Sequence, residues 1–518
     1  MRHNISWGVL LCCTIVLISA GFSHAQTELF NGKLRVKGLL DEYIVFREHK
    51  HHDSQQHDYG QALVLWRHRA QVELLFRLYE KSDTIINFYT WLQYYYESGP
   101  DVNRKLRKAM SSGQRYRDYQ APFWDSDDML NECYLDINTG PWTIRLGKQK
   151  VIWGEMELQR TTDVVNPLDL RYSSPGIDDL DELKIGIWMA RVLYQSSLPG
   201  DLIFEFIFNP GDYKMIRLGI QGSDRGSPSV PNQELGGLGV TGAIKEMYDK
   251  SEPAFALNNC EVGFRLRGMY NTKLFGEHFE FLWTLQYFNA LNDSMIVDDV
   301  EAYSDWAAEF AIARGDGVIR PLPRKDIYDA KRFEMFGLGI QTFDPILTEA
   351  VIISEFAYFR GLDFNKTDNR GLTRSGKIER DFFTYGLSIR RALKARFFKK
   401  LDHSAQGYVD TDLSIFQGWY IGNVSRVYQT FAYGQRSSTT FTLMFRTHFR
   451  NQTYTPVLRL LYTTRNTGYV SLSCTVSLST HWLFVVGYTQ TYGNDPTQDG
   501  YAAARDKTRT YVKIKFRF

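Results

Sequence analysis

Cysteine is scarce in this chain of 518 residues, which contains five. Two of them, Cys12 and Cys13, lie near the N-terminus, and the other three are Cys133, Cys260 and Cys474. An odd number at such wide spacing indicates neither a disulfide framework nor a zinc cage built from thiolates. The fold must therefore be held together by other means.

Long apolar runs are also missing after Ala25. No uninterrupted stretch approaches the roughly 20 apolar residues that a transmembrane helix requires. The mean hydropathy of −0.34 is too low for a bundle of membrane helices. It is compatible with a transmembrane barrel, because half of each barrel strand is polar. Aromatic residues make up 15% of the chain, which suits the two interfacial girdles of such a barrel.

The N-terminus has the features of an export signal. Arg2 precedes an apolar run from Trp7 to Phe22, and Ser23-His24-Ala25 offers small residues at a cleavage site. We expect a signal peptide over residues 1–25 and one membrane domain over residues 26–518. An uncleaved membrane anchor is the alternative, but the apolar run is short for one.

The C-terminus alternates between apolar and polar residues. Its apolar phase consists of Val512, Ile514, Phe516 and Phe518. A strand places successive side chains on opposite faces, so this segment has one apolar and one cationic face. The apolar face would point to a core in a soluble sandwich and to lipid in a barrel. A terminal aromatic after such alternation resembles the C-terminal signal of bacterial outer-membrane barrels.

The same alternation recurs along the whole chain. Short turns, such as 81–83 and 138–141, alternate with long polar connections, such as 98–128 and 210–256. Outer-membrane barrels sort their connections in this way, with short periplasmic turns and long outer loops. The sequence therefore predicts an all-β, antiparallel, up-and-down transmembrane barrel of about 18 strands, closed by pairing of the last strand with residues 33–47. A count of 16 stays open, because the long connection 394–406 falls where a short turn is expected.

One segment carries a family resemblance. After a strand at 142–150, its distinctive residues are Gly147, Trp153, Gly154, Asp163, Asn166, Pro167 and Asp169. Over residues 142–172 the sequence resembles an uncharacterised family of Gram-negative outer-membrane porin-like proteins, broadly similar to alginate-export-type barrels. The resemblance implies a large β-barrel of transport type and no particular substrate.

The polar residues of this segment suggest a constriction. A barrel of about 18 strands is too wide for wall side chains to fill, so a loop must narrow it. We expect the loop around 150–172 to fold into the lumen, with Lys148, Gln149, Glu155 and Arg160 facing the pathway. The alternative is a rigid outer loop whose polar groups satisfy one another.

Basic residues outnumber acidic ones on the polar phase of the predicted strands. Those that we expect to line the pore include Arg145, Arg265, Arg267 and Arg446. Fixed charge of one sign raises the local concentration of the opposite ion. The sequence thus predicts a preference for anionic solutes. Alternatively, the charges pair across neighbouring strands and brace the wall with little net field.

The leading functional hypothesis is a channel for passive diffusion of small hydrophilic solutes. An export barrel for a polysaccharide or secreted compound, and a loop-plugged structural or adhesive barrel, are the alternatives. Enzyme activity is not expected, because the motifs G-x-S-x-G and H-E-x-x-H are absent from the sequence. The spacing of the Ser, His and Asp residues also selects no catalytic triad. Residues 237–242 match G-x-G-x-x-G without the βαβ unit that a dinucleotide site requires.

We expect no cofactor and no metal, although a histidine-rich stretch at 49–58 could bind one. The expected location is the cell outer membrane. The expected partners are outer-membrane lipids and lipopolysaccharide (for which residues 104–117 offer a basic patch), the barrel-assembly machinery and small solutes, with no nucleic acid. The sequence leaves open whether the protein is a monomer or a trimer.

Overall fold

A computed structural model provides the structure of the chain. It describes residues 26–47, 63–102, 129–156, 160–170, 180–218, 253–294, 296–297, 328–366, 377–401, 407–422, 427–428, 437–464, 466–493 and 508–518. The expected signal peptide, the histidine-rich stretch 49–58, the basic patch 104–117 and the motif at 237–242 all lie outside these residues.

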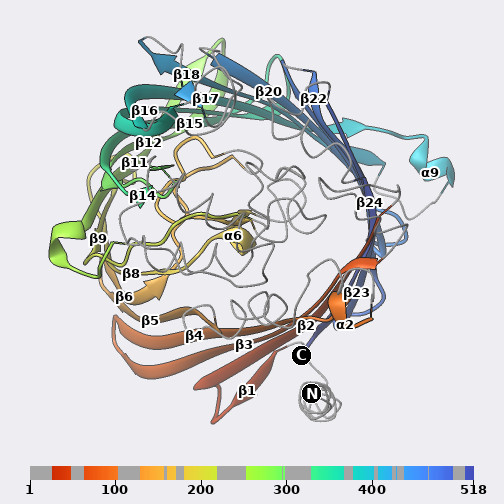
Figure 1. Cartoon of the computed structure of the whole chain (residues 1–518), viewed down its shortest axis with the longest axis horizontal. Coiled ribbons are helices and arrows are strands. Elements are labelled where there is room, and N and C mark those ends of the chain that lie inside the picture. The colour runs from red at the N-terminus through yellow and green to blue at the C-terminus, as the bar shows by residue number, and fades with distance from the viewer. Residues whose placement is uncertain are drawn as a thin grey trace, which may run out of the picture.

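A single antiparallel sheet closes on itself to form a barrel (Figure 1). In the described residues this sheet has 20 strands, of which β1 (Thr27–Leu29) and β19 (Val427–Tyr428) are short additions, and the other 18 form the wall. In chain order the wall strands are β2 (Leu34–Arg47), β3 (Leu63–Lys81), β4 (Thr84–Glu97), β5 (Leu130–Thr139), β6 (Trp142–Gln149), β8 (Ile187–Gln195), β9 (Ile203–Asn209), β11 (Glu261–Leu274), β12 (Glu277–Leu291), β15 (Arg332–Asp344), β16 (Ala350–Lys366), β17 (Lys377–Lys394), β18 (Tyr408–Ile421), β20 (Ser437–Arg446), β21 (Tyr454–Thr463), β22 (Thr467–Ser477), β23 (Trp482–Tyr492) and β24 (Arg509–Arg517). The predicted fold class and strand count are confirmed.

The connections alternate in length as the sequence predicts. The β3–β4, β5–β6 and β11–β12 hairpins close with two-residue turns. Alternation in the sequence predicts a strand over residues 256–271, whereas β11 continues to Leu274 and turns at Phe275–Gly276. At the other end of the wall, which we call the outer end, most connections are long, and residues 464–466 between β21 and β22 form a short exception. The basic connection after β17 contains the helical turn α9 (Phe398–Leu401), which explains why it is longer than its neighbours.

Elements outside the sheet are few and short within the described residues. They include the helical turns α2 (Gly99–Val102), α6 (Leu180–Leu183) and η3 (Leu257–Asn259), and the strand pairs β7 (Asp169–Leu170) with β10 (Arg217–Leu218) and β13 (Ile296–Val297) with β14 (Tyr328–Asp329). In the part of the chain that the structure describes, no helix has the length and apolar character of a membrane span.

The outer face of the wall is apolar. Large hydrophobic side chains such as Phe264, Leu472 and Val486 are at least half exposed, at 50%, 54% and 50%. Their neighbours in sequence point to the interior, as alternation along a strand requires. A closed barrel leaves no unpaired strand edge in the hydrocarbon region, and an apolar outer band suits contact with lipid. The protein is an outer-membrane β-barrel.

Barrel closure occurs where the sequence places it. Strand β24 pairs with β2 over nine residue pairs from Leu39–Arg517 to Arg47–Arg509. The terminal residue extends this pairing, since the Gly38 N–H donates to the Phe518 carbonyl at 2.7 Å and the Phe518 N–H donates to the Gly38 carbonyl at 3.0 Å. The Phe518 ring lies over Gly38, where a Cβ atom would come within 2.0 Å of it. Phe518 is thus a structural part of the seam.

Replacing Gly38 with leucine is expected to lower the yield of folded barrel. The larger side chain displaces the Phe518 ring from the seam, and overpacking of this kind costs about 1–3 kcal/mol. The folded fraction is measured by heat-dependent electrophoretic mobility. A Leu40→Val variant, at the next outward-facing position of β2, serves as the control, and an undiminished folded fraction for Gly38→Leu would contradict the role of the seam.

Candidate functional site

A segment between β6 and β8 lies inside the barrel. We call residues 150–170 the infolded segment, of which 150–156 and 160–170 are described. It begins where β6 ends, near Gly147, whose φ of 138° and contact with the Cys133 carbonyl (2.2 Å from a would-be Cβ) admit only glycine. Figure 1 shows α6, which follows this segment in the chain, within the ring of wall strands.

Asn166 holds the two ends of the infolded segment together. Its side-chain oxygen accepts the Val151 N–H at 2.7 Å, and its amide donates to the carbonyls of Gln149 and Ile185 at 3.1 and 2.8 Å. The Pro167 carbonyl accepts the Ile185 N–H at 2.9 Å. The segment is therefore a closed loop pinned at the base of its two arms.

Asp163 and Arg160 brace the interior of this loop. The Asp163 carboxylate accepts the Trp153 N–H at 3.0 Å and pairs with the buried Lys184 ammonium at 2.7 Å. Gly154 lets Asp163 approach, since a Cβ there would lie 2.9 Å from the Asp163 Cβ. Arg160 donates to the carbonyls of Asp163 and Asn166, both at 2.6 Å. The loop is rigid because its polar groups satisfy one another.

Trp153 anchors the infolded segment to the wall formed by β9, β11 and β12. Its indole N–H donates to Glu205 at 3.3 Å, and its carbonyl accepts the Gln286 amide at 2.9 Å. Glu205 is held between two guanidinium groups, with Arg265 at 2.6 Å and Arg191 at 2.7 Å. Arg265 also donates to the carbonyl of Ile152 at 3.0 Å. These wall charges fix the loop at Trp153.

A second contact joins the segment to β16 and β17. The Glu355 carboxylate accepts the Glu155 N–H, and Arg390 donates to the Glu155 carbonyl at 3.1 Å. The wall glycine Gly386 makes room for Met156, whose sulfur would lie 2.1 Å from a Cβ at that position. The segment thus rests on the inner wall at a notch, by which we mean the space that the missing side chain of Gly386 leaves for Met156.

Filling that notch is expected to push the segment off the wall. A Gly386→Leu variant places side-chain atoms where Met156 and Thr161 now sit, so the loop shifts while its own sequence stays intact. We expect a higher single-channel conductance with more current noise in planar bilayers. Gly339→Ala is the matched control, because a Cβ at this buried glycine of β15 meets only Thr284. Equal conductance for Gly386→Leu and the wild type would contradict the seating of the loop.

The opposite side of the lumen is reached through α6. Glu182 pairs with Arg69 of β3 at 3.3 Å and with Lys515 of β24 at 3.7 Å, and Arg69 also pairs with Asp41 at 2.9 Å. The described parts of residues 150–184 therefore contact the inner wall on two sides, at β9, β11, β12, β16 and β17 and at β3 and β24.

Lys150 is the titratable group of the segment with the largest shift. Burial lowers the pKa of Lys150 to about 8, against the opposing influence of Glu132 and Glu182. Its ammonium lies 4.6 Å from the centre of the Trp91 ring and donates to the Asp181 carbonyl at 3.3 Å. Lys150 therefore carries less than its full charge in mildly alkaline solution.

The residues predicted to face the pathway occupy different environments. Lys148 and Gln149 are fully buried, at 1% and 0% exposure, and the Gln149 amide donates to the Met189 carbonyl. Glu155 is exposed inside the barrel and Arg160 is partly exposed. Asp169 lies in β7, which pairs with β10. Their roles in a solute pathway stay predictions.

Many predicted lumen charges form ion pairs. Arg145 pairs with Asp136 at 3.3 Å, Arg390 with Asp412 at 3.1 Å and Arg446 with Asp410 at 3.5 Å. By contrast, Glu205 and Asp41 each serve two arginines, and the Nε atoms of Arg267 and Arg459 have no hydrogen-bond partner among the described residues. Pairing of charges across neighbouring strands is thus extensive in the described residues.

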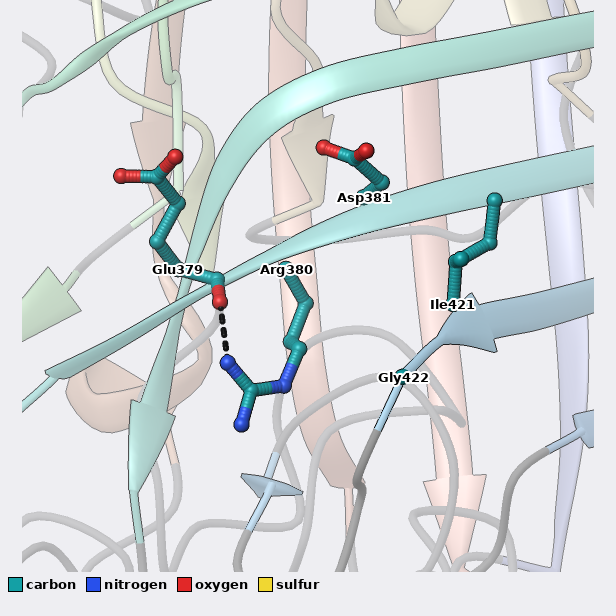
Figure 2. Close-up of a pocket in the computed structure, with 5 residues that line it drawn as sticks. All are labelled: Glu379, Arg380, Asp381, Ile421 and Gly422. Carbon is teal, nitrogen blue, oxygen red and sulfur yellow. Dashed lines mark hydrogen bonds between the residues drawn. The ribbon is translucent and has the colours of Figure 1, made fainter.

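A separate pocket lies at the outer end of β17 and β18. Its volume is about 510 Å³, and Glu379, Arg380, Asp381, Ile421 and Gly422 line it (Figure 2). Arg380 donates to the Glu379 carbonyl at 2.7 Å, and Asp381 accepts the hydroxyl of Tyr358 at 2.6 Å. Asp381 belongs to the outward-facing phase of β17, so this pocket is distinct from the infolded segment. Within the described residues no group of three or more His, Cys, Asp or Glu side chains could hold a metal ion.

Sequence reasoning missed the contributions of Lys184 and Glu182. Alternation in the sequence predicts a strand over residues 184–196, whereas Lys184 precedes β8 and its ammonium is buried against Asp163. Glu182 belongs to a connection in which the sequence shows no periodicity. Neither residue carries a local signal, because each acquires its role from a partner distant in the chain.

Comparison with known proteins adds a family match over part of the chain. A family model described as a protein of unknown function (DUF1302) matches residues 82–202, which include the infolded segment. No curated protein matches the sequence. Neither comparison supports the resemblance to alginate-export-type barrels noted in the sequence.

Solved outer-membrane structures resemble the fold at low identity. OccAB2 of Acinetobacter baumannii has a TM-score of 0.45 and 10% identity, covering 94% of this chain and 98% of that one. OpdK of Pseudomonas aeruginosa, solved with vanillate, has a TM-score of 0.42 and 9% identity over the same shares. Salmonella typhi OmpF, solved with daunomycin, has a TM-score of 0.41 and 8% identity, covering 95% and 100%. These values carry no information about the solute of this protein.

Proposed function

We propose that the protein is a porin-like channel through which small hydrophilic solutes diffuse, with the infolded segment as its constriction. The observation that carries this proposal is the attachment of residues 150–170 to the inner wall through Trp153, Glu205 and Arg265. A barrel of 18 strands encloses more space than wall side chains fill. A rigid polar loop inside it leaves a narrowed aqueous path with defined lining groups.

The lining favours anionic solutes. Glu205 faces the two guanidinium groups of Arg191 and Arg265, so this cluster keeps one positive charge. On the other side of the lumen, Asp41 and Glu182 together face three cations, namely Arg67, Arg69 and Lys515, which also leaves one positive charge. Fixed positive charge within low-dielectric walls concentrates anions. The extensive pairing elsewhere on the wall limits the size of this preference.

One observation favours a plugged barrel as the second candidate. Val151 and Trp153 are 0% and 1% exposed and belong to one hydrophobic cluster with the wall residues Ile187, Phe288 and Met335. A segment packed this well could close the lumen and serve a structural or adhesive role. Export of a polymer is supported by no contact in the described residues.

Planar-bilayer recording on the refolded full-length protein distinguishes these functions. A channel gives discrete conductance steps. In a salt gradient, the reversal potential of an anion-preferring channel shifts toward the equilibrium potential of the anion. A folded protein without conductance supports the plugged barrel. Cation selectivity would reject the anion preference while leaving the channel in place.

A further inference from the structure

Three polar side chains on adjacent strands form a hydrogen-bonded relay. The hydroxyl of Ser98, directly after β4, lies 2.7 Å from Nε2 of His68 on β3. Nδ1 of the same imidazole lies 2.8 Å from the carboxylate of Glu42 on β2. The indole N–H of Trp66 donates to the other oxygen of Glu42 at 2.8 Å, which fixes the carboxylate. Among the described residues, Nε2 of His68 thus faces a hydroxyl and Nδ1 faces a carboxylate.

This relay lies on the outside of the barrel. Along β2, the buried residues Asp41, Tyr43 and Val45 face the lumen, so Glu42 belongs to the outward phase with the exposed Phe46. His68 is the register partner of Glu42 in the neighbouring strand. The side chains of His68 and Glu42 are 27% and 36% exposed. A molecule held in the membrane can therefore reach the relay from the side.

The height of the relay places it near the outer leaflet. Ser98 follows the last residue of β4 at the outer end of the wall, and the periplasmic β3–β4 turn lies at the other end of the same hairpin. Aromatic side chains flank the imidazole, with Trp66 at 5.3 Å and Tyr96 at 6.1 Å between ring centroids. Aromatic rings of this kind mark the membrane–water interface of barrels. The acyl-ester linkages of lipids also lie at such an interface.

An imidazole that bonds a hydroxyl through Nε2 and a carboxylate through Nδ1 is the arrangement that activates a serine nucleophile. Such triads are recognised by their geometry and roles, and their order in the chain varies. We propose that Ser98 and His68, positioned by Glu42, form a hydrolase site for acyl esters of lipids in the outer leaflet. This activity is additional to the proposed channel and does not depend on the lumen.

The reaction follows from the atoms present. The Ser98 Oγ attacks the ester carbonyl carbon while its proton moves to His68 Nε2, and the ester C–O bond breaks as that proton passes to the leaving alcohol. Water then attacks the acyl carbon, gives a proton to Nε2, and releases the fatty acid as Oγ regains its proton. Glu42 keeps Nδ1 protonated and stabilises the imidazolium that forms in each half. The sum is ester plus water giving fatty acid plus alcohol.

The test uses the refolded full-length protein in vesicles, with two ester sources in separate arms. One arm contains phosphatidylethanolamine alone, and the other contains lipopolysaccharide in a phospholipid carrying ether-linked chains. Released fatty acid is measured in both, and a fluorophosphonate probe is used to label nucleophilic serines, with the labelled peptide identified by mass spectrometry. We expect labelling of Ser98 and release of fatty acid in at least one arm, which identifies the lipid class.

Variants separate the site from contamination and from misfolding. Ser98→Ala and His68→Gln are expected to lower fatty-acid release by about 100-fold or more, with wild-type channel conductance as evidence of folding. Ser437→Ala is the matched control, because Ser437 also lies at the outer end of a wall strand, where β20 begins, and belongs to the outward phase. Activity that persists in Ser98→Ala, or no labelling and no release in either arm, overturns the proposal.

Glu42 is a positioning residue, so its test needs a readout beyond loss of rate. Glu42→Gln removes the negative charge that keeps His68 in the active tautomer, and we expect a lower maximal rate together with a shifted pH profile. Glu42→Asp restores part of the rate because it keeps the carboxylate. An equal loss in both variants with an unchanged pH profile would mean that Glu42 only supports the fold, and it would overturn the triad assignment.

Discussion

Removal of residues 155–172 is expected to raise the single-channel conductance several-fold. This stretch contains the part of the infolded segment that Arg160, Asp163 and Asn166 hold rigid inside the barrel. Without it the interior is limited mainly by the wall, and the conductance of a water-filled pore rises as its narrowest section widens. The wall strands keep their own pairing, because β6 and β8 remain hydrogen-bonded from Trp142–Tyr194 to Gln149–Ile187. The barrel should therefore still close.

The measurement is planar-bilayer recording on the deletion and on a variant in which a Gly-Ser linker of the same length replaces residues 155–172. Replacing residues 397–401, in the basic connection after β17, with a Gly-Ser linker is the control for loop editing in general. Both lumen variants should conduct more than the wild type, and the control should not. Unchanged conductance in a folded deletion variant would rule out this segment as the constriction.

The barrel could be predicted because its signal is local and repeated. The alternation of apolar residues such as Val512, Ile514 and Phe516 follows from strand geometry alone. The short connections indicate the periplasmic end of the barrel and the long connections the outer end. Closure also followed, since only pairing between the first and last strands removes both edges. The errors lie at strand ends, such as β11, which continues to Leu274 because the turn needs only Phe275 and Gly276.

The internal contacts could not be predicted, because they join residues far apart in the chain. The segment bearing Trp153 was expected to fold inward, but nothing local indicates that Glu205 accepts its indole N–H or that Glu355 accepts the backbone of Glu155. The relay of Ser98, His68 and Glu42 was invisible for the same reason. Its members are 26 and 30 residues apart, a spacing set by strand and loop lengths and not by any motif.

Replacing Glu205 with alanine is expected to release the infolded segment at Trp153. Glu205 is 3% exposed and neutralises Arg265, which is 4% exposed, together with Arg191. Breaking a buried ion pair by removing one partner costs about 3–5 kcal/mol, because the remaining charge has no compensation. Two guanidinium groups then repel each other at the site where the loop is anchored. We expect a lower thermal-unfolding temperature, noisier and larger current steps, and stronger anion selectivity.

Two further variants tie this effect to the buried charge. Glu205→Gln/Arg191→Gln removes one charge of each sign and should recover most of the unfolding temperature, since one fewer cation is left uncompensated. Asp136→Ala is the matched control, because its pair with Arg145 is about one-fifth exposed on β5 and β6 and water screens the charge that remains. If Asp136→Ala changes current noise and selectivity as much as Glu205→Ala does, the effect comes from wall charge in general. If Glu205 anchors the loop, Glu205→Ala makes the current noisy and Asp136→Ala does not, because among the described residues Glu205 is the wall carboxylate that accepts the Trp153 indole N–H.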